Sequence, residues 1–140
     1  MPEREYAAIA GASMGGFFAI YAGLERSDIF SKAVAFSPAV WFGSRNINFW
    51  LSQNHLLDHI STNHVGEVDF WIYVGGKESH SHECFVYPCP SVGYFPDIYA
   101  QGAHHTSDIL GGHFVYNPHG AHFSNEFISY FGHAFDWLGW

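Results

Sequence analysis

Ile9-Ala10-Gly11-Ala12-Ser13-Met14-Gly15-Gly16 is the stretch that decides how this chain folds. It places Ser13 among glycines at the spacing of a tight turn between a strand and a helix. The apolar run Tyr6–Ala10 suits a buried strand, and Phe17–Leu24 suits a buried helix. A serine at the tip of such a turn is held in a strained backbone, and we expect side chains at Gly11 or Gly15 to collide with the neighbouring strand and helix.

Strands and helices alternate along the rest of the chain. Apolar runs predict further strands at Lys32–Ser37, Val68–Val74 and Phe114–Tyr116. Periodic apolar positions predict helices at Phe49–Ile60, Ile98–Leu110 and Asn125–Leu138, the last with one face formed by Phe127, Phe131, Phe135 and Leu138. Between them, Ser79–Tyr94 has no period and is expected to be a long loop. This alternation predicts a single α/β domain, residues 1–140, with a mostly parallel sheet of about four strands flanked by helices.

The charge balance excludes some classes of partner. The net charge is −8 with histidine neutral, and the five Lys and Arg residues are scattered, so no nucleic-acid footprint is present. No signal peptide is visible, and no apolar run approaches the ~18 residues of a membrane span. We therefore expect a soluble cytoplasmic protein without membrane contact, although two cysteines leave the compartment open. No cofactor or metal is expected.

Three side chains have the types and order needed for nucleophilic catalysis. A serine hydroxyl such as that of Ser13 needs a base, and the base needs an acid to orient it. Glu78 follows the strand Val68–Val74 and His122 follows the strand Phe114–Tyr116, so all three groups would emerge at one edge of a parallel sheet. The helix behind Ser13 would direct the Met14 N–H toward a developing oxyanion.

Other residues compete for two of these roles. His119 is a rival to His122 as the base, because both lie in the same loop. Glu83 and Asp97 are rivals to Glu78 as the acid, but Glu78 is favoured because it comes directly after a strand end.

The motifs together resemble a known family. They are Ile9–Gly16, Ala35-Phe36-Ser37-Pro38-Ala39, Tyr73–Glu78, and Gly120-Ala121-His122 followed by Phe131, Ala134, Trp137 and Leu138. The chain resembles the C-terminal part of the putative esterase family of α/β-hydrolases, which includes esterase D type enzymes and enterochelin esterases. The resemblance implies hydrolysis of a small-molecule ester through an acyl-enzyme. In it Ser13 is the nucleophile, the Met14 N–H an oxyanion donor, His122 the general base and Glu78 the orienting acid.

The chain also departs from the pattern of that family. Phe123-Ser124 stands where the family usually has an acidic residue, and Phe127 stands where it has a tryptophan. The family has several strands before the motif around Ser13, and one of their loops supplies a second oxyanion donor. The resemblance therefore implies a partial α/β-hydrolase fold lacking the N-terminal strands, a truncated chain that is weak or inactive alone.

Two other functions stay open. The residues His80, His82, Glu83 and Cys84, with His104-His105 further on, suit a His-rich metal-binding protein. The first strand would also have an unpaired edge, which suits a non-catalytic interaction module or self-association through that edge.

Overall fold

The computed structural model describes residues 3–40, 62–76, 78, 103–104, 106–121 and 124–140. Their strands form one parallel sheet whose spatial order follows the chain: β1 (Ala8–Ala12), β2 (Lys32–Phe36), β3 (Asp69–Gly75) and β4 (His113–Asn117). This confirms the expected α/β class and the parallel sheet of about four strands.

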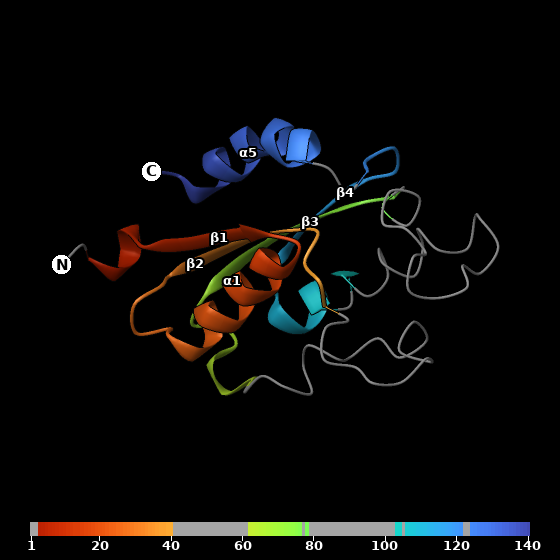
Figure 1. The fold of residues 1–140 in the computed structure, drawn as a ribbon. Helices are drawn as coiled ribbons and strands as arrows, with labels where there is room; N and C mark the ends of the chain where they lie inside the picture. The colour runs from red at the N-terminus through yellow and green to blue at the C-terminus, as the bar shows by residue number, and fades with distance from the viewer. Residues whose placement is uncertain (1–2, 41–61, 77, 79–102, 105, 122–123) are drawn as a thin grey trace.

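Helices cover both faces of the sheet (Figure 1). Helix α1 (Met14–Glu25) lies on one face and α5 (Ser124–Leu138) on the other. Residues 103–104 and 106–110 are also helical, and two 3-10 turns, η1 (Arg4–Tyr6) and η3 (Thr62–His64), lie elsewhere. None of the described helices is long and apolar enough to cross a membrane. The predicted helix Phe49–Ile60 and loop Ser79–Tyr94 lie outside the described residues.

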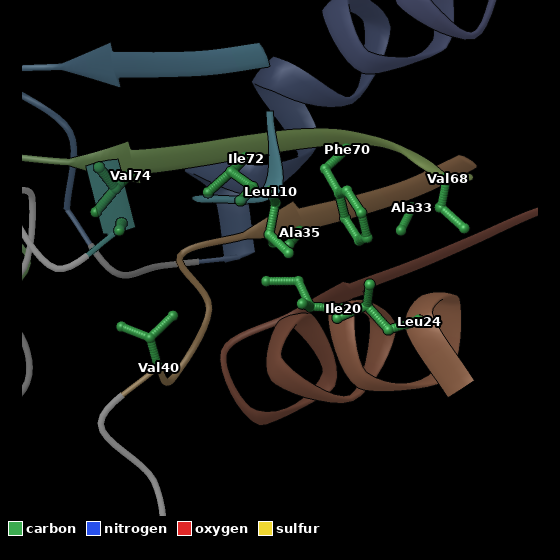
Figure 2. Close-up of a cluster of buried hydrophobic side chains, with 11 residues drawn as sticks. Ile20, Leu24, Ala33, Ala35, Val40, Val68, Phe70, Ile72, Val74 and Leu110 are labelled. Carbon is green, nitrogen blue, oxygen red and sulfur yellow. The ribbon is translucent and has the colours of Figure 1, made fainter. Parts of the chain in front are cut away.

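The core has two layers, because β3 is buried on both faces. Alternate residues of β3 point to opposite sides of the sheet. Phe70, Ile72 and Val74 belong to one buried cluster with Ile20 and Leu24 of α1, and Figure 2 shows these side chains spread along the face of the sheet that α1 covers. On the other face Trp71 and Tyr73 pack with Val34, Phe36 and Ala134. Strands covered on both faces need the near-continuous apolar runs from which they were predicted.

The first strand begins later than its apolar run predicts. Tyr6 lies in η1 and is 59% exposed, and β1 extends instead through Ala12. The turn forms because the Tyr6 N–H donates to the Glu3 carbonyl at 2.9 Å, while the guanidinium of Arg4 donates to the carbonyls of Ser27 and Glu67. These contacts hold Arg4–Tyr6 in a 3-10 turn, so β1 begins at Ala8 and not at Tyr6.

The buried face of α5 also differs from the prediction. Phe131 and Phe135 are 53% and 52% exposed, although Phe131 still stacks on Phe36 with ring centroids 6.3 Å apart. Ala134 is the buried residue, and the side chains packed beside it are Phe127, Tyr130, Trp137 and Leu138. The small Ala134 lets the helix approach the large rings of β3, so the helix is rotated from the expected face.

β1 forms one edge of the described sheet. It pairs with β2 alone among the described strands and carries no charged residue or proline. A groove of about 460 Å³ follows it, lined by Ala10, Gly11, Ala12, Phe36, Phe127, Ile128, Phe131 and Gly132. Among the described strands, β1 therefore has one neighbour and an apolar groove beside it.

Candidate active site

Ser13 sits at the junction of β1 and α1 in a backbone conformation that few L-residues adopt. Its φ is 56° and its ψ is −118°. Three hydrogen bonds hold it there: its N–H donates to the Phe36 carbonyl at 2.9 Å, and its carbonyl accepts the N–H groups of Phe17 and Ala39, both at 3.0 Å. Ser13 is the residue before the first helical position, yet its side chain makes no capping hydrogen bond. The hydroxyl is thus held at the tip of the turn without serving the helix.

The glycines around Ser13 let the helix approach the strands closely. A Cβ on Gly11 would overlap with the carbonyl of Gly15, which confirms that this position must be small. The prediction for Gly15 was wrong, because a Cβ there meets nothing within 4 Å. The second crowded position is Gly16, whose Cβ would lie 3.1 Å from both the Phe36 carbonyl oxygen and the Cα of Pro38. Helix α1 crosses the strand ends on its Gly16 side, so Gly15 faces open space.

The start of α1 can stabilise negative charge near Ser13. Met14 is the first helical residue, and the first helix bond runs from the Phe17 N–H to the Ser13 carbonyl. The N–H groups of the preceding three residues come before that bond and lie at the positive end of the helix dipole. A donor such as the Met14 N–H therefore suits an oxyanion that forms on a group bound to Ser13.

Glu78 is a buried residue whose side chain accepts hydrogen bonds from the ends of two strands. It follows β3 and is 4% exposed. Its Oε1 accepts the Gly75 N–H at 2.6 Å and the hydroxyl of Ser37. Such a position is costly for a carboxylate unless hydrogen bonds compensate for the lost water, and here they come from the ends of β2 and β3. The rivals Glu83 and Asp97 lie outside the described residues.

His122 lies outside the described residues, and the loop that leads to it begins beside the other strand ends. Gly75 pairs with Asn117, the last residue of β4, so this loop starts at the edge where Glu78 lies. The rival His119 is exposed, and its backbone N–H donates to Asn117 Oδ1 at 3.1 Å. The choice between the two histidines thus remains a prediction.

Two residues near the site were missed from the sequence. Ser37 follows β2 and joins it to Glu78, as described above. Tyr73 is fully buried, its hydroxyl lies 3.3 Å from Glu126 Oε2, and burial raises the pKa of Tyr73 well above the usual range of a tyrosine. A Cβ on Gly120 would overlap with this hydroxyl, so Tyr73 supports the loop after β4. A sequence signal for both residues exists: each is a polar side chain, inside a buried strand for Tyr73 and directly after one for Ser37.

No group of three metal-binding side chains occurs within the part of the chain that the structure describes. His80, His82, Glu83, Cys84 and His105 lie outside that part. His104 is described, and it pairs with Asp108 at 3.4 Å on an exposed helix surface.

The chain is similar to known esterases in sequence pattern and in fold. The model of a family described as "Putative esterase" matches residues 2–88. A solved "ferulic acid esterase" is similar over 99% of this chain and 52% of its own, with 18% identity and a TM-score of 0.65. The siderophore hydrolase EstB from Aspergillus nidulans is similar over 94% and 48%, with 18% identity and a TM-score of 0.60.

A third structure extends the same likeness. The enterobactin esterase FES from Shigella flexneri, solved in the presence of enterobactin, is similar over 89% of this chain and 28% of its own, with 18% identity and a TM-score of 0.54. This chain thus spans about half the length of the first of these structures and less of the FES structure. At this identity the likeness shows the fold. No curated protein sequence matches the chain.

Proposed function

This chain belongs to the putative esterase family, and from that premise we propose that it hydrolyses carboxylic esters with Ser13 as the nucleophile. The observation that carries the proposal is the geometry of Ser13, which combines a positive φ with a hydroxyl that does not cap its helix. A structural serine at a helix start would normally use its oxygen as a cap. Strain kept at such a position is typical of a functional residue.

The proposed reaction proceeds through an acyl-enzyme. The Ser13 oxygen attacks the ester carbonyl carbon while His122 accepts the hydroxyl proton, and the Met14 N–H donates to the resulting oxyanion. The intermediate collapses, and the alcohol leaves with the proton from His122. Water, deprotonated by the same imidazole, then releases the acid and restores Ser13. Glu78 orients the imidazole and stabilises its cation.

The test compares variants in hydrolysis of a short-chain nitrophenyl ester. Ser13→Ala should stay folded and lose about 10³-fold or more in kcat, whereas Ser129→Ala, at an exposed serine of α5, should leave kcat unchanged. Phosphonate labelling should occur on the parent chain and not on Ser13→Ala. Equal rates for the parent and Ser13→Ala would end the assignment.

The identity of the base has its own test. A neutral imidazole must accept the proton, so kcat/KM should fall on the acid side of the pH profile as the histidine becomes protonated. His122→Ala should abolish activity, and His119→Ala should retain it. The opposite result would assign the base to His119.

A second candidate function is self-association through β1. The observation that favours it is the uncharged edge of β1 together with the apolar groove beside it. Edge strands without charges, prolines or bulges pair readily with other strands. Two copies pairing through β1 would bury this edge, so the sedimentation coefficient should rise with protein concentration.

A further inference from the structure

We propose that Ser37 is a positioning residue that links the nucleophile turn to the carboxylate of Glu78. The inference rests on the proposed esterase function, because it assigns a role to Ser37 in that reaction. In the described structure, the turn formed by residues 37–39 contacts Ser13 on one side and Glu78 on the other. Each contact is a hydrogen bond with a named donor.

The contact with Glu78 is made by the side chain of Ser37. This serine comes directly after β2, is 3% exposed, and has a φ of 46°. Its N–H donates to the Tyr73 carbonyl at 2.6 Å, so its backbone is anchored to β3. Its hydroxyl donates to Glu78 Oε1, which lies 41 residues away in sequence. A serine with positive φ is uncommon, and here this conformation accompanies the bond to the carboxylate.

The contact with the nucleophile is made by the backbone of the same turn. The Ala39 N–H donates to the Ser13 carbonyl at 3.0 Å. The Cα of Pro38 lies 3.1 Å from where a Cβ on Gly16 would be, so the turn packs against the start of α1. Proline fixes its own φ, which restricts the conformations open to this turn. A shift of the turn would thus move Ser13 and Glu78 together.

The bond from Ser37 restrains how the carboxylate can rotate. Oε1 accepts the Gly75 N–H at 2.6 Å as well as the Ser37 hydroxyl, so both bonds hold the same oxygen. In the proposed triad, Glu78 in turn orients the imidazole. Loss of the hydroxyl removes one of these restraints on Glu78, and the imidazole loses part of its orientation. Orientation of the base matters most in the transition state, so the effect should fall on kcat and not on KM.

The experiment removes the hydroxyl in two ways. Ser37→Ala keeps the positive φ of 46°, whereas Ser37→Gly relieves it. Both variants should lose about tenfold in kcat and in the rate of phosphonate labelling of Ser13, with KM within about twofold of the parent value. A role in stability alone would instead separate the two variants, because glycine is the easier residue at this φ.

A matched control exists at the other end of the sheet. The hydroxyl of Ser27, which is 8% exposed, donates to Glu67 Oε2 at 2.7 Å, so a buried serine again donates to a glutamate, although Glu67 is exposed and Glu78 is buried. Ser27→Ala should leave kcat and the labelling rate within about twofold of the parent values. An equal loss of activity in Ser27→Ala and Ser37→Ala would mean that any lost serine–glutamate bond disturbs the fold, and the proposal would be wrong.

A double-mutant cycle tests the link without requiring turnover. Ser37→Gly, Glu78→Ala and the combined variant are compared in urea unfolding, because alanine leaves no acceptor for the hydroxyl. The combined change in the unfolding equilibrium constant should fall short of the product of the single changes by about tenfold. If the single changes multiply, the hydroxyl does not hold the carboxylate and the inference fails.

The two proposals fail in different ways. If Ser13→Ala abolishes turnover and labelling while both Ser37 variants keep them, the role of Ser37 is wrong and the esterase function stands. If neither turnover nor labelling depends on Ser13, the esterase function fails, and with it the catalytic role of Ser37, whatever the cycle shows.

Discussion

Replacing Ser13 by glycine should make the protein more stable than replacing it by alanine. Both variants lose the hydroxyl, so the comparison isolates the backbone. The alanine variant keeps a side chain at φ 56° and ψ −118°, and backbone strain of this kind is worth about 1–3 kcal/mol. Glycine relieves that strain but loses about 0.5–1 kcal/mol more conformational entropy on folding. The balance favours glycine by about 1 kcal/mol.

Urea unfolding, followed by tryptophan fluorescence, measures this difference. The midpoint should be higher for Ser13→Gly than for Ser13→Ala at equal slope, and Tm should differ by about 3–5 °C. The matched control is Ser129, an exposed residue inside α5. There the order should be reversed, with glycine about 1 kcal/mol less stable than alanine, because glycine is a poor helix former.

The sign of the stability difference between Ser13→Gly and Ser13→Ala tests whether the turn is strained. If Ser13→Gly is less stable than Ser13→Ala, as at Ser129, the turn carries no strain that glycine can relieve. The reasoning from the positive φ to a functional serine would then fail.

Three further predictions concern packing, pH and association. Gly16→Ala should lower the free energy of unfolding by about 1–3 kcal/mol because its Cβ meets the Phe36 carbonyl and Pro38. Gly15→Ala should leave the free energy of unfolding unchanged or raise it by about 0.5 kcal/mol, because the added Cβ meets nothing. Thermal unfolding of the two variants measures this difference. Hydrogen bonds from Ser27 and His64 lower the pKa of Glu67 below its ordinary 4.5, so Glu67→Gln should be less stable than the parent above that pH. In urea unfolding at a series of pH values, this difference should vanish as the pH falls through the lowered pKa, and a difference that persists in acid would contradict the reasoning. Ala10→Lys places a charge on the exposed edge of β1 and should abolish any concentration dependence of sedimentation, and an unchanged dependence would rule out this edge.

The sequence predicts the turn at Ser13 well because every part of its signal is local. Small residues at the turn, an apolar run before it and another after it are enough to place a strand, a serine and a helix. The position of Glu78 directly after β3 follows from the same kind of pattern, whereas its burial is seen only in the structure. Alternation of strands and helices then gives the parallel sheet, since few topologies satisfy it.

Features that depend on contacts between distant residues could not be predicted in this way. The bond from Ser37 to Glu78 joins residues 41 apart in sequence, and no local pattern indicates it. Which glycine is crowded depends on how α1 crosses the strand ends, and the spacing of residues suggested Gly15 where the structure has Gly16. The rotation of α5 likewise depends on the rings opposite Ala134.

The order of the strands has a consequence for how the chain folds during synthesis. The sheet runs β1, β2, β3, β4, so each described strand pairs with the one that precedes it in the chain. Translation proceeds from the N-terminus at about 5–20 residues per second, and folding can begin on the emerging part. Each of β2, β3 and β4 therefore meets a partner that has already left the ribosome, and none of these described strands has to insert between two that are already paired. Helix α5 follows the four described strands in the chain, so the aromatic rings of β3 that it covers stay exposed until α5 itself has been made.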